Sequence, residues 1–172
     1  MNILFDFYFT LVEWEDETSR TLRTLPDVRE TLMTLLENGH RLSVVSNWSN
    51  DLKDVLDDLK LSNFFSVIVA SEDDDINSEK PDSKIFLKTI EKLQVPKETC
   101  LYIGDNYVTD YVGAKAVDIF SVLIDTDGWR KEKYPHVLCL GKFTQIPSLV
   151  KIIERHGNPG TINNLKGGHR KY

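Results

Sequence analysis

Short apolar runs alternate with amphipathic helical patterns along most of this chain, and this alternation constrains the fold more than any other feature. The runs have the length of buried strands and are bounded by turn residues. We predict strands at 2–7, 41–45, 65–70, 100–103, 120–124 and 137–140, and helices that begin near residues 26, 50, 82, 110 and 147. The alternation is typical of βαβ units, so it predicts an α/β fold with a mostly parallel sheet and helices on both faces.

The chain of 172 residues is long enough for one domain with a sizeable core. We predict a folded domain at 1–156 and a flexible basic tail at 157–172, where four glycines accompany three basic residues. The net charge of −6 argues against general nucleic-acid binding, because such binding needs a basic surface.

The ends and cysteines of the chain bear on its location. The first residues enter the predicted strand directly, without the basic segment that opens a signal peptide. No apolar run approaches the roughly 20 residues of a membrane span. Cys100 and Cys139 lie in apolar stretches, and we expect them to be small unpaired side chains in a reducing compartment. We therefore predict a cytoplasmic protein that does not bind membranes.

Polar side chains follow several of the predicted strands. Asp6, Ser46 and Asp105 each come at the end of an apolar run. Because ligands of open parallel sheets bind outside the carboxyl ends of the strands, we expect these side chains to meet at one edge. Asp6 can attack phosphorus or carbon, bind a metal, or only cap a loop. Ser46 can hold an anion with nearby N–H groups, or cap a helix.

Lys80 and two carboxylates add charges of both signs to this set. A lysine close to a carboxylate nucleophile offsets its charge and that of an incoming anion, although alone it equally suits an ordinary surface residue. Asp105 and Asp110 suit Mg²⁺, which prefers oxygen ligands and keeps several waters. Asp110 can also cap the helix that is predicted to follow.

Four blocks together resemble the haloacid dehalogenase-like (HAD) hydrolase superfamily over residues 1–125. They are Asp6-Phe7-Tyr8-Phe9-Thr10-Leu11, Ser46-Asn47, Lys80-Pro81-Asp82 with Ile85-Phe86, and Gly104-Asp105 with Asp110 and Gly113-Ala114. The resemblance implies a Rossmann-like, three-layer α/β/α sandwich around a central, mostly parallel sheet.

The resemblance also implies a role for each block. Asp6 would be the nucleophile, and Lys80 would neutralise charge beside it. Mg²⁺ would be bound by Asp6, the backbone carbonyl of Tyr8 and Asp105. The phosphoryl group would be bound by Thr10, Ser46 and Asn47. Asp110 and Asn106 would lie around the metal ligands.

Positions 8 and 9 depart from the family pattern. HAD phosphatases usually carry an aspartate at position 8 that serves as general acid and then as base, whereas this chain has Tyr8. A phenol is poorly matched to acid–base work at neutral pH, and losing such a group costs roughly 10²–10⁴-fold in rate. Phe9 replaces the usual glycine, so we expect a reshaped turn after the nucleophile.

With a tyrosine at position 8, the first motif resembles that of the metal-independent haloacid dehalogenases of the same superfamily. Those enzymes carry a serine where this chain has Asp105, and they need a helical cap domain. Only 35 residues separate Thr10 from Ser46, and only 32 separate Asn47 from Lys80. These intervals leave room for little beyond the core elements, so we predict that the chain has no cap domain.

A site without a cap is open to water and to large substrates. The resemblance then implies a macromolecular substrate or a cover supplied by a neighbouring subunit. Trp14, Trp48 and Trp129 lie near predicted strand ends. They can pack on a substrate or partner, or simply be half-buried in loops.

These observations predict a Mg²⁺-dependent phosphatase that acts through a phosphorylated Asp6 and is slowed by the missing acid at position 8. The predicted substrate is a small phosphorylated metabolite or a phosphorylated macromolecule. Two alternatives stay open, a metal-independent dehalogenase-like hydrolase and a non-catalytic module that binds phosphate or metal. Tyr8 favours the last alternative, and the intact set of Asp6, Lys80 and Asp105 opposes it.

Overall fold

A computed structural model describes residues 1–16, 18 and 21–157 of the chain. Within these residues, six strands form one parallel sheet in the order β5-β4-β1-β6-β7-β8. The strands of this sheet are β1 (Asn2–Phe5), β4 (Arg41–Ser46), β5 (Val67–Ala70), β6 (Cys100–Gly104), β7 (Phe120–Ile124) and β8 (Cys139–Leu140). A separate antiparallel hairpin, formed by β2 (Val12–Trp14) and β3 (Leu22–Thr24), follows β1.

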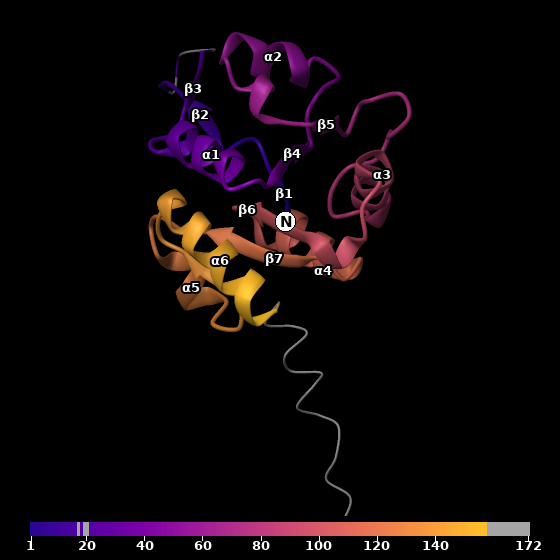
Figure 1. Ribbon diagram of the computed structural model, residues 1–172. Coiled ribbons are helices and arrows are strands. Elements are labelled where there is room, and N and C mark those ends of the chain that lie inside the picture. Colours follow the sequence, from indigo (N-terminus) through magenta and orange to yellow (C-terminus); the bar gives the residue numbers. More distant parts are fainter. Residues whose placement is uncertain (17, 19–20, 158–172) are drawn as a thin grey trace, which may run out of the picture.

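Helices cover both faces of the sheet, as the sequence predicted. The α-helices are α1 (Val28–Glu37), α2 (Leu52–Asp58), α3 (Ser83–Leu93), α4 (Gly113–Ala116), α5 (Trp129–Lys133) and α6 (Ile146–His156). Short 3₁₀ turns occupy Ser62–Phe64, Lys97–Thr99 and Phe143–Gln145. Helices α1 and α6 lie on one side of the sheet, and α3 and α4 lie on the other (Figure 1).

Alternating side chains of the central strand reach both layers of the core. Ile3 and Phe5 of β1 belong to the hydrophobic cluster under α1 and α6, whereas Leu4 belongs to the cluster under α3. All three side chains are fully buried. This two-sided burial explains why β1 is a continuous apolar run in the sequence. The predicted three-layer α/β/α architecture is therefore confirmed.

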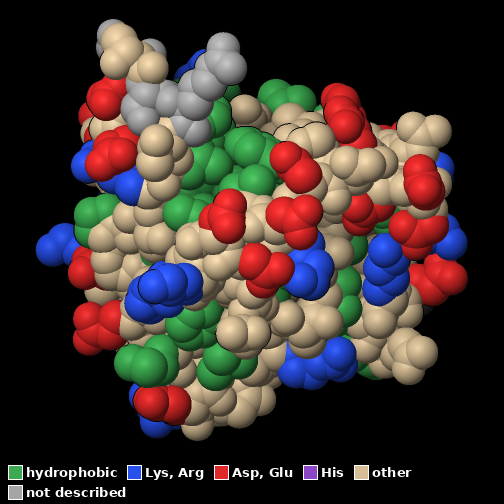
Figure 2. Space-filling model, turned by 90° about the horizontal axis from the view of Figure 1, so that it is seen from above, with side chains coloured by type: hydrophobic (Ala, Val, Ile, Leu, Met, Phe, Trp, Pro, Cys, Tyr) green, Lys and Arg blue, Asp and Glu red, His purple; other side chains and the backbone are tan. Residues whose placement is uncertain are grey.

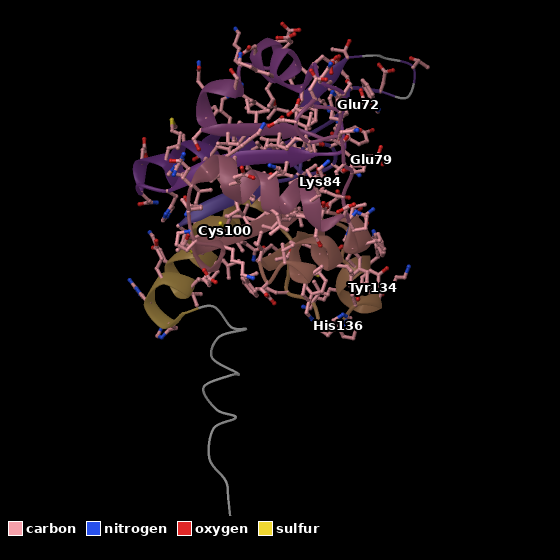
Figure 3. The ribbon with its side chains drawn as sticks, turned by 90° about the vertical axis from the view of Figure 1, so that its right-hand side faces the viewer. Glu72, Glu79, Lys84, Cys100, Tyr134 and His136 are labelled. Atoms are coloured by element: carbon pink, nitrogen blue, oxygen red, sulfur yellow. The ribbon has the colours of Figure 1, made fainter. Side chains whose placement is uncertain are left out.

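The register of the parallel strands brings their carboxyl ends to one edge of the sheet. Phe5 pairs with Val44 of β4 and with Ile103 of β6. Figure 3 shows the two ends of the sheet: Cys100, the first residue of β6, lies on one side, and Glu72, Glu79 and Tyr134 lie on the other. The residues that follow β1, β4 and β6 therefore meet at a common edge.

Some element boundaries differ from the sequence prediction. Helix α1 begins at Val28 instead of Pro26, because Asp27 adopts a left-handed conformation with φ of 63°. The helix predicted to start at Asp110 is instead a π-helical turn, Tyr107–Val112, that runs into the four-residue α4. The side chain of Asn106 begins this turn earlier than expected by accepting hydrogen bonds from the backbone N–H groups of Val108 and Thr109.

The intervals between the sequence motifs hold only small elements. The described residues between Thr10 and Ser46 form the β2–β3 hairpin and α1, and those between Asn47 and Lys80 form α2, a 3₁₀ turn and β5. This content agrees with the prediction that no cap domain is present in the described part of the chain.

Three other expectations concern the location of the protein and its C-terminal tail. In the ranges 1–16, 18 and 21–157, no helix is long and apolar enough to cross a membrane. Cys100 and Cys139 are unpaired, the first buried and the second half-buried. The predicted tail at 157–172 lies outside the described residues, apart from Gly157.

Candidate active site

A buried ion pair between Asp6 and Lys80 forms the centre of the site. The backbone N–H of Asp6 donates to the carbonyl of Ile103 at 2.8 Å, which fixes Asp6 directly beyond β1. The Lys80 ammonium donates to Asp6 Oδ1, with 2.7 Å between Nζ and Oδ1. Asp6 is 8% exposed and Lys80 is 4% exposed. The structure therefore brings together the predicted nucleophile and the predicted cation.

The loop that carries Lys80 is tied to the loop after β4. The Asn47 side-chain amide donates to the carbonyl of Lys80 at 2.9 Å, and its Oδ1 accepts from the Lys80 backbone N–H at 2.7 Å. Asn47 thus closes a two-bond ring with the main chain of Lys80. This arrangement gives Asn47 a structural role beside the phosphate-binding role that remains a prediction.

Asp110 holds Lys80 from the opposite side. Its Oδ1 accepts from the Lys80 ammonium at 2.7 Å, and its Oδ2 accepts from the backbone N–H groups of Asp105 and Asn106 at 3.0 and 2.9 Å. Both oxygens of Asp110 are therefore engaged, so the side chain supports the site without being free to bind a metal. The place of Asp110 around the ligands of a metal stays a prediction.

Gly104 leaves the space that the Asp110 carboxylate occupies. A Cβ atom at position 104 would lie 2.3 Å from Asp110 Oδ2. We therefore expect Gly104→Ala to lower the free energy of unfolding by roughly 1–3 kcal/mol, the cost of overpacking a buried site. Denaturant titration measures this loss, and Gly141→Ala is the control because a Cβ there meets nothing within 4 Å. Equal stabilities for the two variants would contradict the close packing.

Arg130 is a site residue that the sequence analysis missed. Its guanidinium donates to Asp105 Oδ2 at 2.8 Å and also to the Asp105 carbonyl. The Asp125 carboxylate, at the end of β7, accepts from the backbone N–H groups of Arg130 and Lys131 at 3.1 and 2.8 Å and so fixes the start of α5. In the sequence, the only signal that could have pointed to Arg130 is that it follows the end of a predicted strand.

A stack of aromatic side chains joins α5 to the turn after Asp105. The rings of Tyr107 and Tyr134 stack with 3.8 Å between centroids and 7° between planes. His136 lies close to Tyr134 at the surface (Figure 3) and its Nε2 is 3.2 Å from the Tyr107 hydroxyl. This packing holds the segment that carries Arg130 against the segment that carries Asp105.

The buried charges of the site are predominantly negative. One carboxylate oxygen from each of Asp6, Asp105 and Asp110 lies within 4.8 Å of the others. Burial raises the pKa of Asp6 to about 7 although Lys80 acts in the opposite direction, and burial raises the pKa of Asp105 to about 6. Burial alone would lower the pKa of Lys80, but attraction to Asp6 and Asp110 outweighs it and the pKa is raised. Lys80 therefore stays charged.

The donor set fits a hard divalent cation. Within the described residues, neither Asp6 Oδ2 nor Asp105 Oδ1 has a hydrogen-bond partner, whereas the other oxygen of each carboxylate is bound. Two carboxylates that each keep one free oxygen match the way proteins usually bind Mg²⁺, which retains several waters. The raised pKa of both groups arises mainly from burial, with a further contribution from the neighbouring carboxylate of Asp110.

The affinity for Mg²⁺ is expected to depend on pH. Because Asp6 and Asp105 must lose their protons to bind a cation, and their pKa values are about 7 and about 6, affinity should rise as the pH is raised. The rise should span pH about 5 to about 8 and then level off. Isothermal titration calorimetry at several pH values measures this change, and an affinity that does not vary with pH would contradict it.

A family model described as haloacid dehalogenase-like hydrolase matches residues 3–124 of the chain. The chain belongs to this family. HAD relatives include haloacid dehalogenase-like hydrolase domain-containing protein 3 of Mus musculus, 33% identical over 112 residues that are 64% of this chain and 44% of that protein. A glyceraldehyde 3-phosphate phosphatase of Methanopyrus kandleri is 34% identical over 130 residues, 72% of this chain and 51% of that protein.

The chain spans about half the length of these two HAD relatives. A crystal structure of an uncharacterized protein from Listeria monocytogenes serotype 4b shares the fold, with a TM-score of 0.75 and 19% identity. The match covers 90% of this chain and 98% of that one. The fold therefore also occurs in a neighbour of nearly the same extent as the described domain.

The remaining predicted residues of the HAD site lie around this centre. Ser46 ends β4 and is buried, with its carbonyl accepting from the backbone N–H of Ser71 at 3.0 Å. Thr10 is fully buried, and its hydroxyl has no hydrogen-bond partner among the described residues. Their contact with a phosphoryl group, like metal binding by the Tyr8 carbonyl, stays a prediction.

Aromatic side chains flank Asp6. Tyr8 contacts Phe9, Trp14 and Trp48, with 4.1, 5.9 and 6.4 Å between ring centroids. Phe9 is 54% exposed and adopts a φ of 59°, in the left-handed region that glycine favours, so a reshaped turn stays a prediction. Figure 2 shows hydrophobic side chains gathered on the surface near β2 and β3.

Proposed function

We propose that this HAD hydrolase is a Mg²⁺-dependent phosphatase that forms a phosphoaspartate on Asp6. The observation that carries this proposal is the pair of free carboxylate oxygens on Asp6 and Asp105, beside an ammonium that is already bound. A bound Mg²⁺ would neutralise the negative charge of the phosphoryl oxygens. The relative named as a phosphatase supports the same reaction class.

The residues of the chain suffice for the transfer step. An oxygen of Asp6 attacks phosphorus while the bond from phosphorus to the leaving oxygen breaks, and Lys80 offsets the added negative charge. The leaving alkoxide takes its proton from water, since position 8 holds no carboxylic acid. A second water then attacks phosphorus and breaks its bond to Asp6, which releases inorganic phosphate and restores the carboxylate. The hydroxide left by the first water takes a proton from the released phosphate.

A cavity beside the site favours a small substrate. It has a volume of about 560 Å³ and its walls include Phe9 and Thr10, which follow the nucleophile, and Arg130, which binds Asp105. This size is ordinary for a small-molecule site. We propose that it holds the leaving group of a small phosphorylated metabolite. A cytoplasmic location and a cover supplied by a second subunit remain predictions.

Hydrolysis of p-nitrophenyl phosphate tests the proposed reaction. We expect p-nitrophenolate release that needs Mg²⁺ and stops in EDTA, with release restored by added Mg²⁺. Glyceraldehyde 3-phosphate, taken from the name of the Methanopyrus kandleri relative, is the first metabolite to compare with a phosphopeptide. Turnover that continues unchanged in EDTA would contradict the proposal.

The same assay separates the two alternatives. Release of chloride from 2-chloropropionate without metal would favour the dehalogenase-like reaction. An absence of turnover on all substrates, together with Mg²⁺ binding that Asp105→Ala abolishes, would favour a non-catalytic binding module.

A further inference from the structure

Tyr102 lies at the centre of the charged site although it looks like a core residue in the sequence. It belongs to β6, three residues before Asp105, and its side chain is fully buried. The ring packs edge-on against Phe86 of α3, with 5.3 Å between centroids and 68° between planes. The hydroxyl at the far end of this ring extends out of the apolar core and into the charged site.

The hydroxyl completes the hydrogen bonding of the Lys80 ammonium. An ammonium has three N–H donors and no acceptor. Lys80 Nζ lies 2.7 Å from Asp6 Oδ1, 2.7 Å from Asp110 Oδ1 and 2.9 Å from the Tyr102 hydroxyl oxygen. The described residues therefore provide one acceptor for each N–H, and Tyr102 provides the neutral one.

The hydroxyl is itself fixed from two sides. Its oxygen is 3.1 Å from the carbonyl of Val45, to which it can donate, and 3.2 Å from Asp110 Oδ1. Val45 belongs to β4 and directly precedes Ser46. The Tyr102 hydroxyl thus links the ends of β4 and β6 to the ammonium that lies between Asp6 and Asp110.

We propose that Tyr102 is a positioning residue that holds the Lys80 ammonium in the orientation in which it donates to Asp6. Without its oxygen, one N–H of a buried ammonium would lack an acceptor, and the ammonium could rotate away from the nucleophile. The proposal rests on the proposed function only in so far as Lys80 assists phosphoryl transfer. The position of the ammonium itself does not depend on any activity.

Tyr102→Phe removes this single oxygen and keeps the ring against Phe86. Thr89→Val is the matched control, because the fully buried Thr89 hydroxyl donates to the Ile85 carbonyl at 2.7 Å within α3 and forms no hydrogen bond with a charged side chain of the described residues. We expect kcat to fall roughly ten-fold to one-hundred-fold in Tyr102→Phe, as for a lost hydrogen bond to a charged group, with KM within two-fold. Thr89→Val should lower stability and leave kcat per folded molecule unchanged.

Side-chain NMR of protein with ¹⁵N-labelled lysine gives a readout that needs no turnover. The wild-type protein should show a slowly exchanging ammonium signal for Lys80, with a nuclear Overhauser contact to the Tyr102 ring. This signal should exchange faster in Tyr102→Phe and stay unchanged in Thr89→Val. The wild-type contact tests the proposal even if Tyr102→Phe does not fold.

Two results would overturn the proposal. The first is a Lys80 signal that lacks the contact to Tyr102 in the wild-type protein. The second is a Tyr102→Phe variant with wild-type kcat and wild-type exchange of the ammonium. A Lys80 signal that shows the contact to Tyr102 and exchanges faster in Tyr102→Phe, in a protein that hydrolyses no phosphate ester, would uphold the role of Tyr102 while rejecting the phosphatase reaction.

Discussion

Replacement of Asp6 by asparagine is expected to lower kcat for p-nitrophenyl phosphate by roughly 10⁴–10⁶-fold, the loss seen when a covalent nucleophile is removed. The amide has nearly the same shape, so it keeps an oxygen within reach of Lys80, but it cannot form a stable bond to phosphorus. It also removes one of the two free carboxylate oxygens at the proposed metal site. Initial rates at saturating Mg²⁺ measure the effect.

A surface carboxylate provides the control for Asp6→Asn. Asp118 forms an ion pair with Lys97 at 2.8 Å and lies at the surface. Asp118→Asn should keep the wild-type rate, because surface ion pairs contribute little to stability. If Asp6→Asn retained more than about one per cent of the wild-type rate, a nucleophilic role for Asp6 would be excluded, since covalent catalysis contributes far more.

Replacement of Tyr8 by aspartate is expected to raise the rate by roughly 10²–10⁴-fold, the usual contribution of a positioned general acid and base. Tyr8 lies two residues after the proposed nucleophile, at the position where HAD phosphatases usually carry an aspartate, and it is half-buried among aromatic rings. The added acid would protonate the leaving group and then activate water. A comparison of kcat between the two proteins measures the gain.

Tyr8→Phe is the control that distinguishes the effect of the side-chain acid from the effect of ring packing. It keeps the ring against Phe9 and Trp14 and removes only the hydroxyl, so its rate should equal that of the wild-type protein. An unchanged or lower rate in a folded Tyr8→Asp variant would show that the missing acid does not limit turnover. Thermal unfolding of each variant excludes a loss of structure as the cause.

The meeting of Asp6 and Asp105 was predictable because parallel strands deliver their carboxyl ends to one edge. Lys80 does not directly follow a strand, and its place beside Asp6, like that of Asp110, was implied by the resemblance to the HAD family. Their hydrogen bonds were not predictable, because these depend on which oxygen faces which donor. Only the structure shows that Asp110 is fully engaged while Asp6 and Asp105 each keep a free oxygen.

Two residues escaped the sequence analysis for different physical reasons. Tyr102 occupies an apolar strand, where an aromatic residue ordinarily marks the core, and only its hydroxyl reaches the site. Arg130 lies in a five-residue helix with no apolar periodicity, which is held in place by Asp125 and by the stack of Tyr134 on Tyr107. Contacts of this kind link distant segments and leave no local pattern.

The β2–β3 hairpin and the π-helical turn were not predicted from the sequence for a similar reason. The strands of the β2–β3 hairpin have three residues each, which is too short for alternation to be recognised. The π-helical turn at Tyr107–Val112 departs from the helical period that the prediction assumed. Both features depend on tertiary contacts more than on local preference.

The close packing of Gly104 against Asp110 gives a criterion for judging related sequences. A homologue can retain Asp6, Lys80, Asp105 and Asp110 and still be inactive if a larger residue stands at position 104, because the carboxylate that supports Lys80 would be displaced. Active and degenerate members of the family can thus be told apart at a position that carries no functional group of its own.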